Sequence, residues 1–374
     1  MLLAVVNETL EGEARVAMVP ELVAKLTDLG YDVVVEPGAG HGAMHPDSAY
    51  VDEGANVDKL ALGDVDVVLS VQPLTTSQVH ELKPGAATFS FLPTAQALDL
   101  VTDLRDQQVT AFAMELVPRI SRAQSMDALS SQALVAGYRC AIVAAGRLRR
   151  FFPLNMTAAG TVPPAEIVVL GAGVAGLQAI ATVKRLGAVV KAYDVRAAAA
   201  EEIRSMGAIA IELELDSLEG TGGYAREMTE ERADRQRELL APYIAAADAL
   251  ITTAALPGRA APKLVTAAMV EAMKPGSVVV DLAAESGGNV EGSVPGAVVP
   301  MGGAQIWGAA NVPSQMPTPA SRLYAQNLVN IVTLMTNEQG FVPDFDDEIV
   351  AGTCVTHAGE VVHGPTREAL ERQE

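Results

Sequence analysis

One glycine motif in the sequence has the composition and spacing that bind a dinucleotide. Residues 171–176 read Gly-Ala-Gly-Val-Ala-Gly, after an apolar run and before a helical pattern. Gly171 permits a tight turn, Gly173 lets the backbone approach a pyrophosphate, and Gly176 lets helix and strand pack closely. The amide groups and the positive dipole end of the helix would face the phosphates. This context favours a nucleotide site over the alternative, a structural glycine-rich turn.

An acidic residue stands where the adenosine ribose of such a nucleotide would bind. Asp194 ends the next predicted strand, 18 residues after Gly176. Its carboxylate accepts hydrogen bonds from a ribose diol and repels a 2′-phosphate, so it favours NAD over NADP. Arg196, two residues further on, weakens that preference because a cation tolerates the phosphate.

A polar loop at residues 118–127 is the second candidate for chemistry. It follows an apolar run, leads into a helical pattern, and contains Arg119, Gln124 and Asp127. These side chains could hold a nicotinamide ribose and its amide group. The alternative is a helix cap at Ser125 with solvated arginines beside it, and spacing alone leaves both interpretations open.

A long insertion at residues 215–238 could form a lid. Connections in folds that alternate strands and helices usually run about 2–6 residues, and longer ones often close over a ligand. Tyr224 and Met228 lie in the insertion and could cover a bound cofactor. The alternative is a surface excursion with a charged helix.

The sequence offers no pattern for a metal or for a covalent intermediate. His41 and His45 lie four residues apart in a glycine-rich loop, but no acidic or thiolate ligand stands beside them. A Ser or Cys nucleophile with a matched base is not visible either. We therefore expect no metal site.

Two series of alternating strands and helices must position these candidates. They predict an α/β fold of two Rossmann-like lobes with parallel sheets and a cleft between them. Apolar runs predict strands at residues 2–6, 32–36, 65–71, 87–92 and 109–115, and then at 167–170, 189–194, 209–213, 249–253, 277–283 and 305–307. Periodic patterns predict helices at residues 20–29, 94–107, 125–152, 176–186, 197–206 and 321–336.

The same patterns suggest how the chain is divided. Residues 1–128 form an N-terminal α/β lobe that the C-terminal segment 312–374 completes, and residues 129–311 form the NAD-binding lobe. The predicted helix 125–152 crosses from one lobe to the other. The Pro-rich patch at residues 312–319 has the composition of a linker, and we expect the polar tail from residue 341 to return to the first lobe.

Composition limits the classes of function. The 374 residues carry 26 Lys and Arg against 46 Asp and Glu, and the net charge of −20 disfavours nucleic acid and membrane surfaces. Two cysteines exclude a disulfide scaffold and favour a reduced, cytosolic setting. The sequence has no signal-peptide pattern and no apolar run of about 18 residues, so we expect any membrane link to come through a partner.

Eight stretches of the sequence together point to one family. They are PRISRAQSMDALSSQ at residues 118–132, TAAGTVPP at 157–164, GVAGLQAIA at 173–181, RLGAVV at 185–190, GGYAREM at 222–228, KPGSVVVDLA at 274–283, NVPS at 311–314 and GTCVT at 352–356. With them the chain resembles, over nearly its whole length, the NAD(H)-binding component of proton-translocating transhydrogenases. This component is known as domain I, and the match is to the form in which it is a separate alpha-subunit chain.

The resemblance implies an activity and partners. Hydride would pass directly from NADH on this chain to NADP⁺ on the NADP(H)-binding domain of a partner chain, with Re/Si specificity. A membrane domain would couple this exchange to proton translocation. The resemblance also implies a homodimer in the cytoplasm, held at the inner face of the cell membrane by its partner subunits and not by insertion of its own.

The resemblance further implies roles for single residues. The catalytic positions that hold the nicotinamide end would be Arg119, Gln124 and Asp127, with Ser130 in the same motif. The other cofactor contacts would come from the glycine turn, the end of the next strand, the insertion and two less specific positions. These are Gly171, Gly173, Val174 and Gly176; Asp194, Val195 and Arg196; Gly223 and Tyr224; and Gln236 and Ala255.

More distantly, the chain is similar to alanine dehydrogenases, which use an Arg, a Lys and a His to bind and protonate an oxo acid. Arg15 matches the first position, but Ser70 and Ser90 stand at the other two. Losing the cation and the proton donor argues against that reaction. Transhydrogenation needs neither, because hydride passes between two nicotinamides. An NAD(H)-binding regulator without enzymatic activity is a third possibility that the sequence leaves open.

Overall fold

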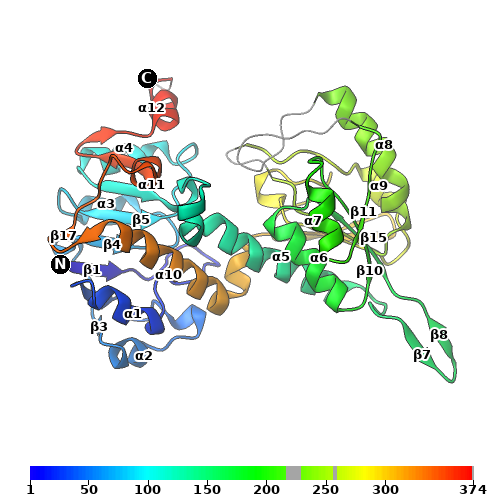
Figure 1. Cartoon of the computed structure of the whole chain (residues 1–374), viewed down its shortest axis with the longest axis horizontal. Coiled ribbons are helices and arrows are strands. Elements are labelled where there is room, and N and C mark those ends of the chain that lie inside the picture. Colours follow the sequence, from blue (N-terminus) through cyan, green and yellow to red (C-terminus); the bar gives the residue numbers. More distant parts are fainter. Residues whose placement is uncertain (216–228, 256–258, 373–374) are drawn as a thin grey trace. The chain divides into compact units, whose positions relative to one another are not determined.

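The structure, a computed structural model, describes residues 1–215, 229–255 and 259–372. The chain divides into two compact units (Figure 1). Unit 1 comprises Met1–Gln132 and Pro313–Glu374, and unit 2 comprises Ala133–Val312. Each unit contains one large sheet with helices packed on both of its faces.

The sheet of unit 1 has the order β19-β18-β6-β5-β4-β1-β2-β3. Its strands are β1 (Leu2–Val5), β2 (Asp32–Val35), β3 (Asn56–Val57), β4 (Val67–Leu69), β5 (Ala87–Ser90), β6 (Thr110–Ala113), β18 (Cys354–His357) and β19 (Glu360–Val361). From β6 to β3 all neighbours are parallel, whereas β18 lies antiparallel to β6 and β19 antiparallel to β18. The C-terminal tail therefore extends the sheet that the N-terminus begins.

Helices cover both faces of the unit 1 sheet. They are α1 (Pro20–Thr27), α2 (Asp47–Asp52), α3 (Thr76–Glu81), α4 (Leu98–Asp106), α10 (Pro317–Leu334), α11 (Glu348–Thr353) and α12 (Gly364–Glu371). One core joins α1 and α10 to Val5, Leu69 and Phe89, and the opposite core joins α3 and α4 to Ala4 and Val68. Because both faces are buried, β1 and β4 are apolar at every position, and the two polar residues of β5, Thr88 and Ser90, are themselves buried.

The Pro-rich patch at residues 312–319 carries the chain from unit 2 into unit 1, but it is helical. A 3₁₀ turn occupies Val312–Gln315, and α10 begins at Pro317. Proline is favourable at the first helical position, because its missing N–H would have no partner inside the helix. The composition that predicted a linker is therefore the start of a buried helix.

The sheet of unit 2 has the order β11-β10-β9-β12-β13-β15-β14. Its strands are β9 (Glu166–Leu170), β10 (Val189–Tyr193), β11 (Ile209–Ala210), β12 (Ala249–Thr252), β13 (Val278–Asp281), β14 (Val298–Met301) and β15 (Ala304–Gly308). All neighbours are parallel except β14 and β15. Strand order reverses between β9 and β12, as in a dinucleotide-binding sheet. The α/β class with parallel-rich sheets is confirmed.

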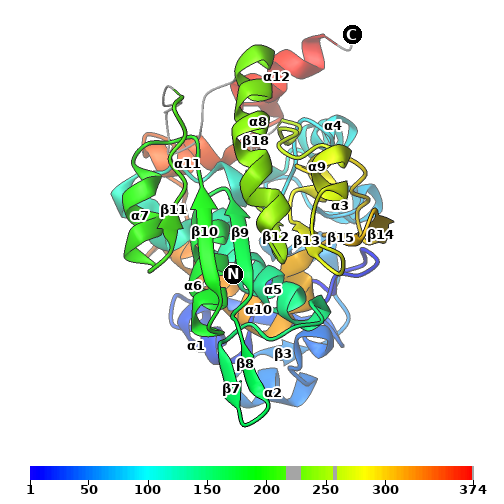
Figure 2. The same cartoon turned by 90° about the vertical axis from the view of Figure 1, so that its right-hand side faces the viewer.

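Helices also cover both faces of the unit 2 sheet, whose strands lie side by side in Figure 2. They are α5 (Ala128–Arg147), α6 (Val174–Arg185), α7 (Ala199–Ser205), α8 (Glu230–Ala246) and α9 (Ala267–Glu271). One core contains residues of α5, α6 and α7, and the other contains residues of α8 and α9. The sequence patterns missed β14 and a hairpin of β7 (Asn155–Thr157) and β8 (Gly160–Val162), because these strands are short and mostly exposed.

Helix α5 is the one helix in the described ranges whose length and composition would allow it to cross a membrane. A core helix passes the same test, and α5 contributes Cys140, Ala141 and Ala144 to the core of unit 2. Its first five residues belong to unit 1 and the remainder to unit 2. The packing therefore accounts for its apolar composition.

Candidate functional site

The glycine motif forms the turn between β9 and α6, where the strand order of unit 2 reverses. Gly171 has φ +96° and donates its N–H to the carbonyl of Tyr193 at 2.8 Å. A Cβ on Gly176 would overlap the carbonyl oxygen of Gly171. The first and third glycines are thus required by the fold of the turn itself.

The middle glycine differs, because its surroundings are open. A Cβ on Gly173 would meet no atom within 4 Å, and its φ of −75° suits any residue. Gly173 is the N-cap of α6, and within the described residues no side chain caps this helix. Val174, the first helical residue, is 41 % exposed. The free N–H groups of the first turn and the open space beside Gly173 fit a pyrophosphate.

Two contacts with other segments of unit 2 hold the glycine turn in place. A Cβ on Gly137 of α5 would overlap the carbonyl oxygen of Ala175, so α5 and the first turn of α6 touch through their backbones. The Thr253 hydroxyl donates to the Gly171 carbonyl at 3.2 Å. The turn is consequently held by two elements, neither of which lies next to it in the sequence.

The Asp194 carboxylate ties the end of β10 to the glycine turn. Its Oδ2 accepts the backbone N–H of Ala172 at 2.7 Å. Its Oδ1 accepts the backbone N–H and the Nε of Arg196, both at 2.9 Å, and Arg196 Nη2 donates to the Ala172 carbonyl at 3.2 Å. Asp194 therefore stands beside the turn, as a ribose-binding acid must, but its charge is shared with Arg196.

The other expected nucleotide contacts lie in different environments. Val195 follows Asp194 and packs on the core, and Ala255 is exposed beyond β12. Gln236 is only 1 % exposed and accepts the Tyr193 hydroxyl at 3.0 Å, so it would act on a nucleotide through Tyr193. Burial raises the pKa of Tyr193 to about 12, which keeps the phenol protonated and donating. Gly223 and Tyr224 lie outside the described residues.

The polar loop of unit 1 is a 3₁₀ segment, Ser121–Met126, that leads into α5. Gln124 is exposed on this segment, and Arg119 is exposed just before it. Asp127 accepts the backbone N–H of Ser130 at 2.9 Å and its hydroxyl at 2.5 Å. The cap of α5 is therefore Asp127, with Ser130 as its partner, and not Ser125.

Contacts with the C-terminal segment hold this loop in place. Arg122 forms a double hydrogen bond with Asp347, at 2.7 and 2.8 Å. The Ser125 carbonyl accepts the side-chain amides of Asn327 and Asn330 of α10, both at 2.9 Å. The exposed side chains of Arg119 and Gln124 thus project from an anchored backbone, which suits residues that orient a ligand.

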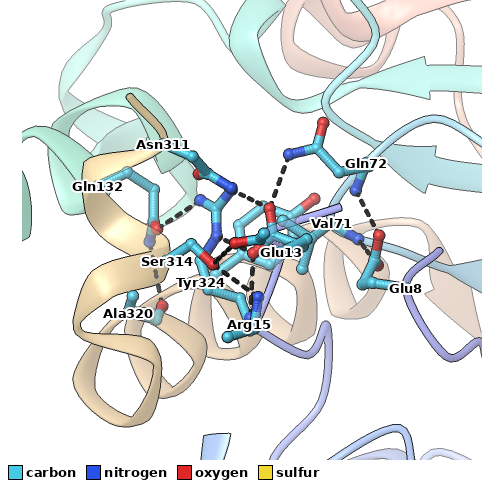
Figure 3. A network of polar contacts seen from close by, with 12 residues as sticks. Glu8, Glu13, Arg15, Val71, Gln72, Gln132, Asn311, Ser314, Ala320 and Tyr324 are labelled. Atoms are coloured by element: carbon cyan, nitrogen blue, oxygen red, sulfur yellow. Dashed lines mark hydrogen bonds and ion pairs between the residues drawn. The ribbon is translucent and has the colours of Figure 1, made fainter. Parts of the chain in front are cut away.

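A second polar site lies where the strand order of unit 1 reverses, between β1 and β4. A cavity of about 430 Å³ is lined there by the loops that follow these two strands. Figure 3 shows Glu8 bridging the loops: its carboxylate accepts the backbone N–H of Val71 at 2.6 Å and that of Gln72 at 3.1 Å. Burial raises the pKa of Glu8 to about 7 despite these hydrogen bonds.

Arg15 forms an ion pair with Glu13, which accepts the side-chain amide of Gln72, a residue that lines this cavity (Figure 3). It donates to Glu13 at 2.7 and 2.8 Å and to Gln132 at 2.9 Å. Although burial opposes it, the Arg15 cation lowers the pKa of Glu13 to about 2. The ion pair satisfies both buried charges, so Arg15 serves the fold of unit 1.

Ser70 and Ser90, at the carboxyl ends of β4 and β5, are both buried. The Ser70 hydroxyl has no hydrogen-bond partner among the described residues. A serine here supplies neither a cation for a carboxylate nor an acid for a carbonyl. Within the described ranges, no three His, Cys, Asp or Glu side chains are grouped so that they could hold a metal ion.

Sequence reasoning missed Glu8 and Thr253, since each acts through a contact with a distant segment. Their only sequence signal is a position at or just after the end of a predicted strand, at the sheet edge where ligands bind. Many other polar residues share that signal.

Changing Glu8 to Gln should flatten the pH dependence of stability. The folded-state pKa lies above the usual value, so the folded protein keeps a proton that the unfolded chain releases between pH 4.5 and about 7. Stability therefore falls as pH rises through this window. We expect E8Q to gain on the order of 2 kcal/mol relative to wild type from pH 5 to pH 8, a value reduced for partial exposure.

Urea unfolding followed by circular dichroism at both pH values measures this difference. Glu11→Gln is the matched control, because Glu11 is an exposed glutamate of the same loop. Parallel pH profiles for wild type and E8Q would contradict the buried, proton-linked role of Glu8.

The strand order of both sheets and the glycine turn define a Rossmann-like nucleotide-binding class of protein. Residues 4–136 match the family model of the alanine dehydrogenase/PNT N-terminal domain, and residues 140–364 match that of the C-terminal domain. The chain belongs to the alanine dehydrogenase/PNT family.

Individual relatives divide between two activities. An alpha-subunit chain of the NAD(P) transhydrogenase of Rhodospirillum rubrum is 48 % identical over 97 % of this chain and 98 % of its own. Alanine dehydrogenase 1 of Staphylococcus aureus is 30 % identical over 89 % and 87 %. Among solved structures, the transhydrogenase from Sinorhizobium meliloti has 44 % identity and a TM-score of 0.86, covering 98 % of this chain and all of its own. The chain is thus homologous to the alpha subunit of NAD(P) transhydrogenase.

Proposed function

We propose that this chain is the NAD(H)-binding component of a proton-translocating transhydrogenase, with Re/Si-specific hydride transfer between NADH and NADP⁺ bound on a partner domain. The observation that carries the proposal is the open Gly173 at the strand-order reversal of unit 2. Similarity to a transhydrogenase alpha-subunit chain along almost the entire sequence supports the same activity. In this proposal the NAD-binding domain comprises residues 129–311, which nearly coincide with unit 2 (Ala133–Val312).

The chain's own residues would bind and orient the nucleotide. The first turn of α6 would donate N–H groups to the pyrophosphate, and Asp194 would accept from the adenosine ribose. Arg119, Gln124 and Asp127 would hold the nicotinamide end on their anchored loop. When bound, the cofactor supplies the transferable hydride, so the protein's contribution is positioning and exclusion of water.

Buried serines separate this function from that of an alanine dehydrogenase, the second candidate that a relative favours. An oxo acid needs a cation for its carboxylate and a proton for its carbonyl oxygen. Ser70 and Ser90 offer neither, and Arg15 is committed to Glu13 and Gln132. Hydride exchange between nicotinamides releases no oxyanion, so it does not require these groups.

The decisive experiment mixes the purified chain with a soluble NADP(H)-binding domain of a transhydrogenase. Hydride transfer from NADH to an NADP⁺ analogue should require both proteins, while pyruvate with ammonium should not oxidise NADH. Absence of transfer, despite NADH binding and contact between the proteins, would contradict the proposal. Oxidation by pyruvate and ammonium would support the dehydrogenase, and binding without any reaction would support a regulator.

The partners follow from the proposed activity. NADP(H) binds on a partner chain, and a membrane domain couples hydride exchange to proton translocation. This chain would then lie in the cytoplasm at the inner face of the cell membrane, held there by these subunits. Its charge of −20 favours docking to a basic face of a partner protein.

A homodimer is also included in the proposal, and the β7–β8 hairpin supports it. The hairpin projects from the unit 2 sheet (Figure 1) and carries Met156, which is 73 % exposed, and Val162, also exposed. Leu154 and Phe151, just before it, are exposed as well. Exposed apolar side chains gathered on one projecting element are typical of an interface between chains.

Met156→Asp should therefore weaken self-association by about tenfold or more, since a charge would have to be buried at the interface. Sedimentation velocity over a concentration series measures the effect. Met44→Asp is the control, because Met44 is 76 % exposed but lies in unit 1 outside the hairpin. Equal association constants for both variants would place the interface elsewhere.

A further inference from the structure

A buried polar cluster lies at the carboxyl ends of β12 and β13, and the function proposed above does not use it. Asp281 is 0 % exposed. Its carboxylate accepts the Thr252 hydroxyl at 3.0 Å and the backbone N–H groups of Ala283, Asn289 and Val290, each at 3.2 Å. The loop after β13 is thus held by hydrogen bonds from its backbone to one buried carboxylate.

The loop presents Asn289 to the neighbouring strand. Asn289 is also 0 % exposed. Its Oδ1 accepts the N–H of Ala254 at 3.0 Å, and its Nδ2 donates to the carbonyl of Ala254 at 2.8 Å and to that of Pro262 at 2.9 Å. This side chain pairs with both backbone groups of Ala254, as a neighbouring strand would.

Ala254 belongs to a backbone corner that touches the glycine turn. Thr253, the preceding residue, donates its hydroxyl to the Gly171 carbonyl at 3.2 Å. A Cβ on Gly171 would lie 2.7 Å from the Thr253 hydroxyl and 3.0 Å from the Ala254 nitrogen. Because the corner packs directly on Gly171, a shift of the corner would change the packing and the hydrogen bond that hold the turn.

We propose that Asn289, held by the buried carboxylate of Asp281, is a positioning residue that presses the Thr253–Ala254 corner against Gly171 and so shapes the glycine turn for a nucleotide. The inference rests on the proposed binding of NAD(H) by unit 2. It makes nucleotide affinity depend on a side chain that contacts Ala254 and Pro262 rather than the nucleotide itself.

A purely structural role would predict a different outcome, and the chain offers a matched control. Asp248 is a buried polar residue at the opposite end of the same strand, β12. Its carboxylate accepts hydrogen bonds from the Arg150 guanidinium at 2.7 Å, from the Lys274 ammonium at 3.1 Å and from the backbone N–H of Glu166 at 2.8 Å. Asp248→Asn should therefore destabilise unit 2 without reaching the glycine turn.

The experiment compares wild type, Asn289→Ala and Asp248→Asn. Emission of the single tryptophan, Trp307, reports the melting transition of unit 2 in each protein. NADH is titrated at a temperature below that transition, and its binding is followed by nucleotide fluorescence. Amide hydrogen exchange of the nucleotide-free proteins is measured in peptides that cover residues 168–176. We expect N289A to weaken NADH binding about tenfold or more and to speed exchange in these peptides, while D248N changes neither beyond twofold.

Two results would overturn the inference. One is unchanged exchange at the turn in N289A, and the other is an equal loss of affinity in both variants. A wild-type protein that fails to bind NADH would instead count against the proposed function, whereas the exchange data would still test the contact between Asn289 and the turn.

Discussion

Gly173→Ala should leave unit 2 folded and weaken NADH binding by about tenfold to a hundredfold. The added methyl group meets no protein atom, and the backbone angles at this position suit alanine. It would, however, occupy the space through which a pyrophosphate approaches the N–H groups of α6. Losing a hydrogen bond to a charged group costs about 1.5–3 kcal/mol, which corresponds to this range of affinity.

Gly176→Ala provides the contrast within the same motif. Its methyl group would overlap the Gly171 carbonyl, so the turn cannot form as it stands. We expect both the melting temperature of unit 2 and the affinity for NADH to fall. The pair of variants thus separates a glycine needed by the ligand from one needed by the fold.

Calorimetric titration with NADH, together with thermal unfolding, checks both variants. A Gly173→Ala protein that binds NADH as wild type does would remove the pyrophosphate from this turn. A Gly173→Ala protein that melts early would show that the open space is needed for folding, and the affinity change would then lose its meaning.

Asp127→Asn should slow hydride transfer by roughly tenfold to a hundredfold while NADH binding changes little. Asparagine caps a helix about as well as aspartate, so the start of α5 should survive the change. What is lost is the charge at the proposed site of the nicotinamide end, and small errors in positioning have effects of this size on transfer. Gln124→Asn, which shortens an exposed side chain on the same loop, should act in the same direction.

Asp127→Ala separates the two roles of this residue. It removes the hydrogen bonds to Ser130 as well as the charge, so it should also lower stability by about 1 kcal/mol. Stopped-flow transfer between bound nucleotides, measured with the partner domain, gives the rate independently of affinity. A large loss of NADH affinity with normal transfer in the bound state would refute the assignment of Asp127 to the nicotinamide end.

The sequence alone was enough to predict the strand, turn and helix around the three glycines. A turn between a strand and a helix is largely local, so the types and spacing of Gly171, Gly173 and Gly176 are enough to indicate it. The same holds for the class of fold. Strands buried on both faces are mostly apolar, and helices between them are amphipathic, so parallel sheets leave a readable pattern.

Short edge strands left no such pattern. Strands β14, β7 and β8 are half-exposed or exposed, and the hydrophobic signal that identifies a buried strand is absent from them. The start of α10 was hidden for a different reason. Prolines are typical of linkers, but the first turn of a helix tolerates them equally well, and composition cannot distinguish these two uses.

Tertiary structure decided how the polar residues are used. The motif around Asp127 was compatible with a nicotinamide contact or a cap at Ser125, and only the folded chain shows that the carboxylate of Asp127 caps α5. Burial raises the pKa of Glu8, whose carboxylate accepts N–H groups from a loop 63 residues away, and Asn289 holds Ala254 across 35 residues of chain. Burial and hydrogen bonding between distant segments depend on packing, which no local pattern encodes.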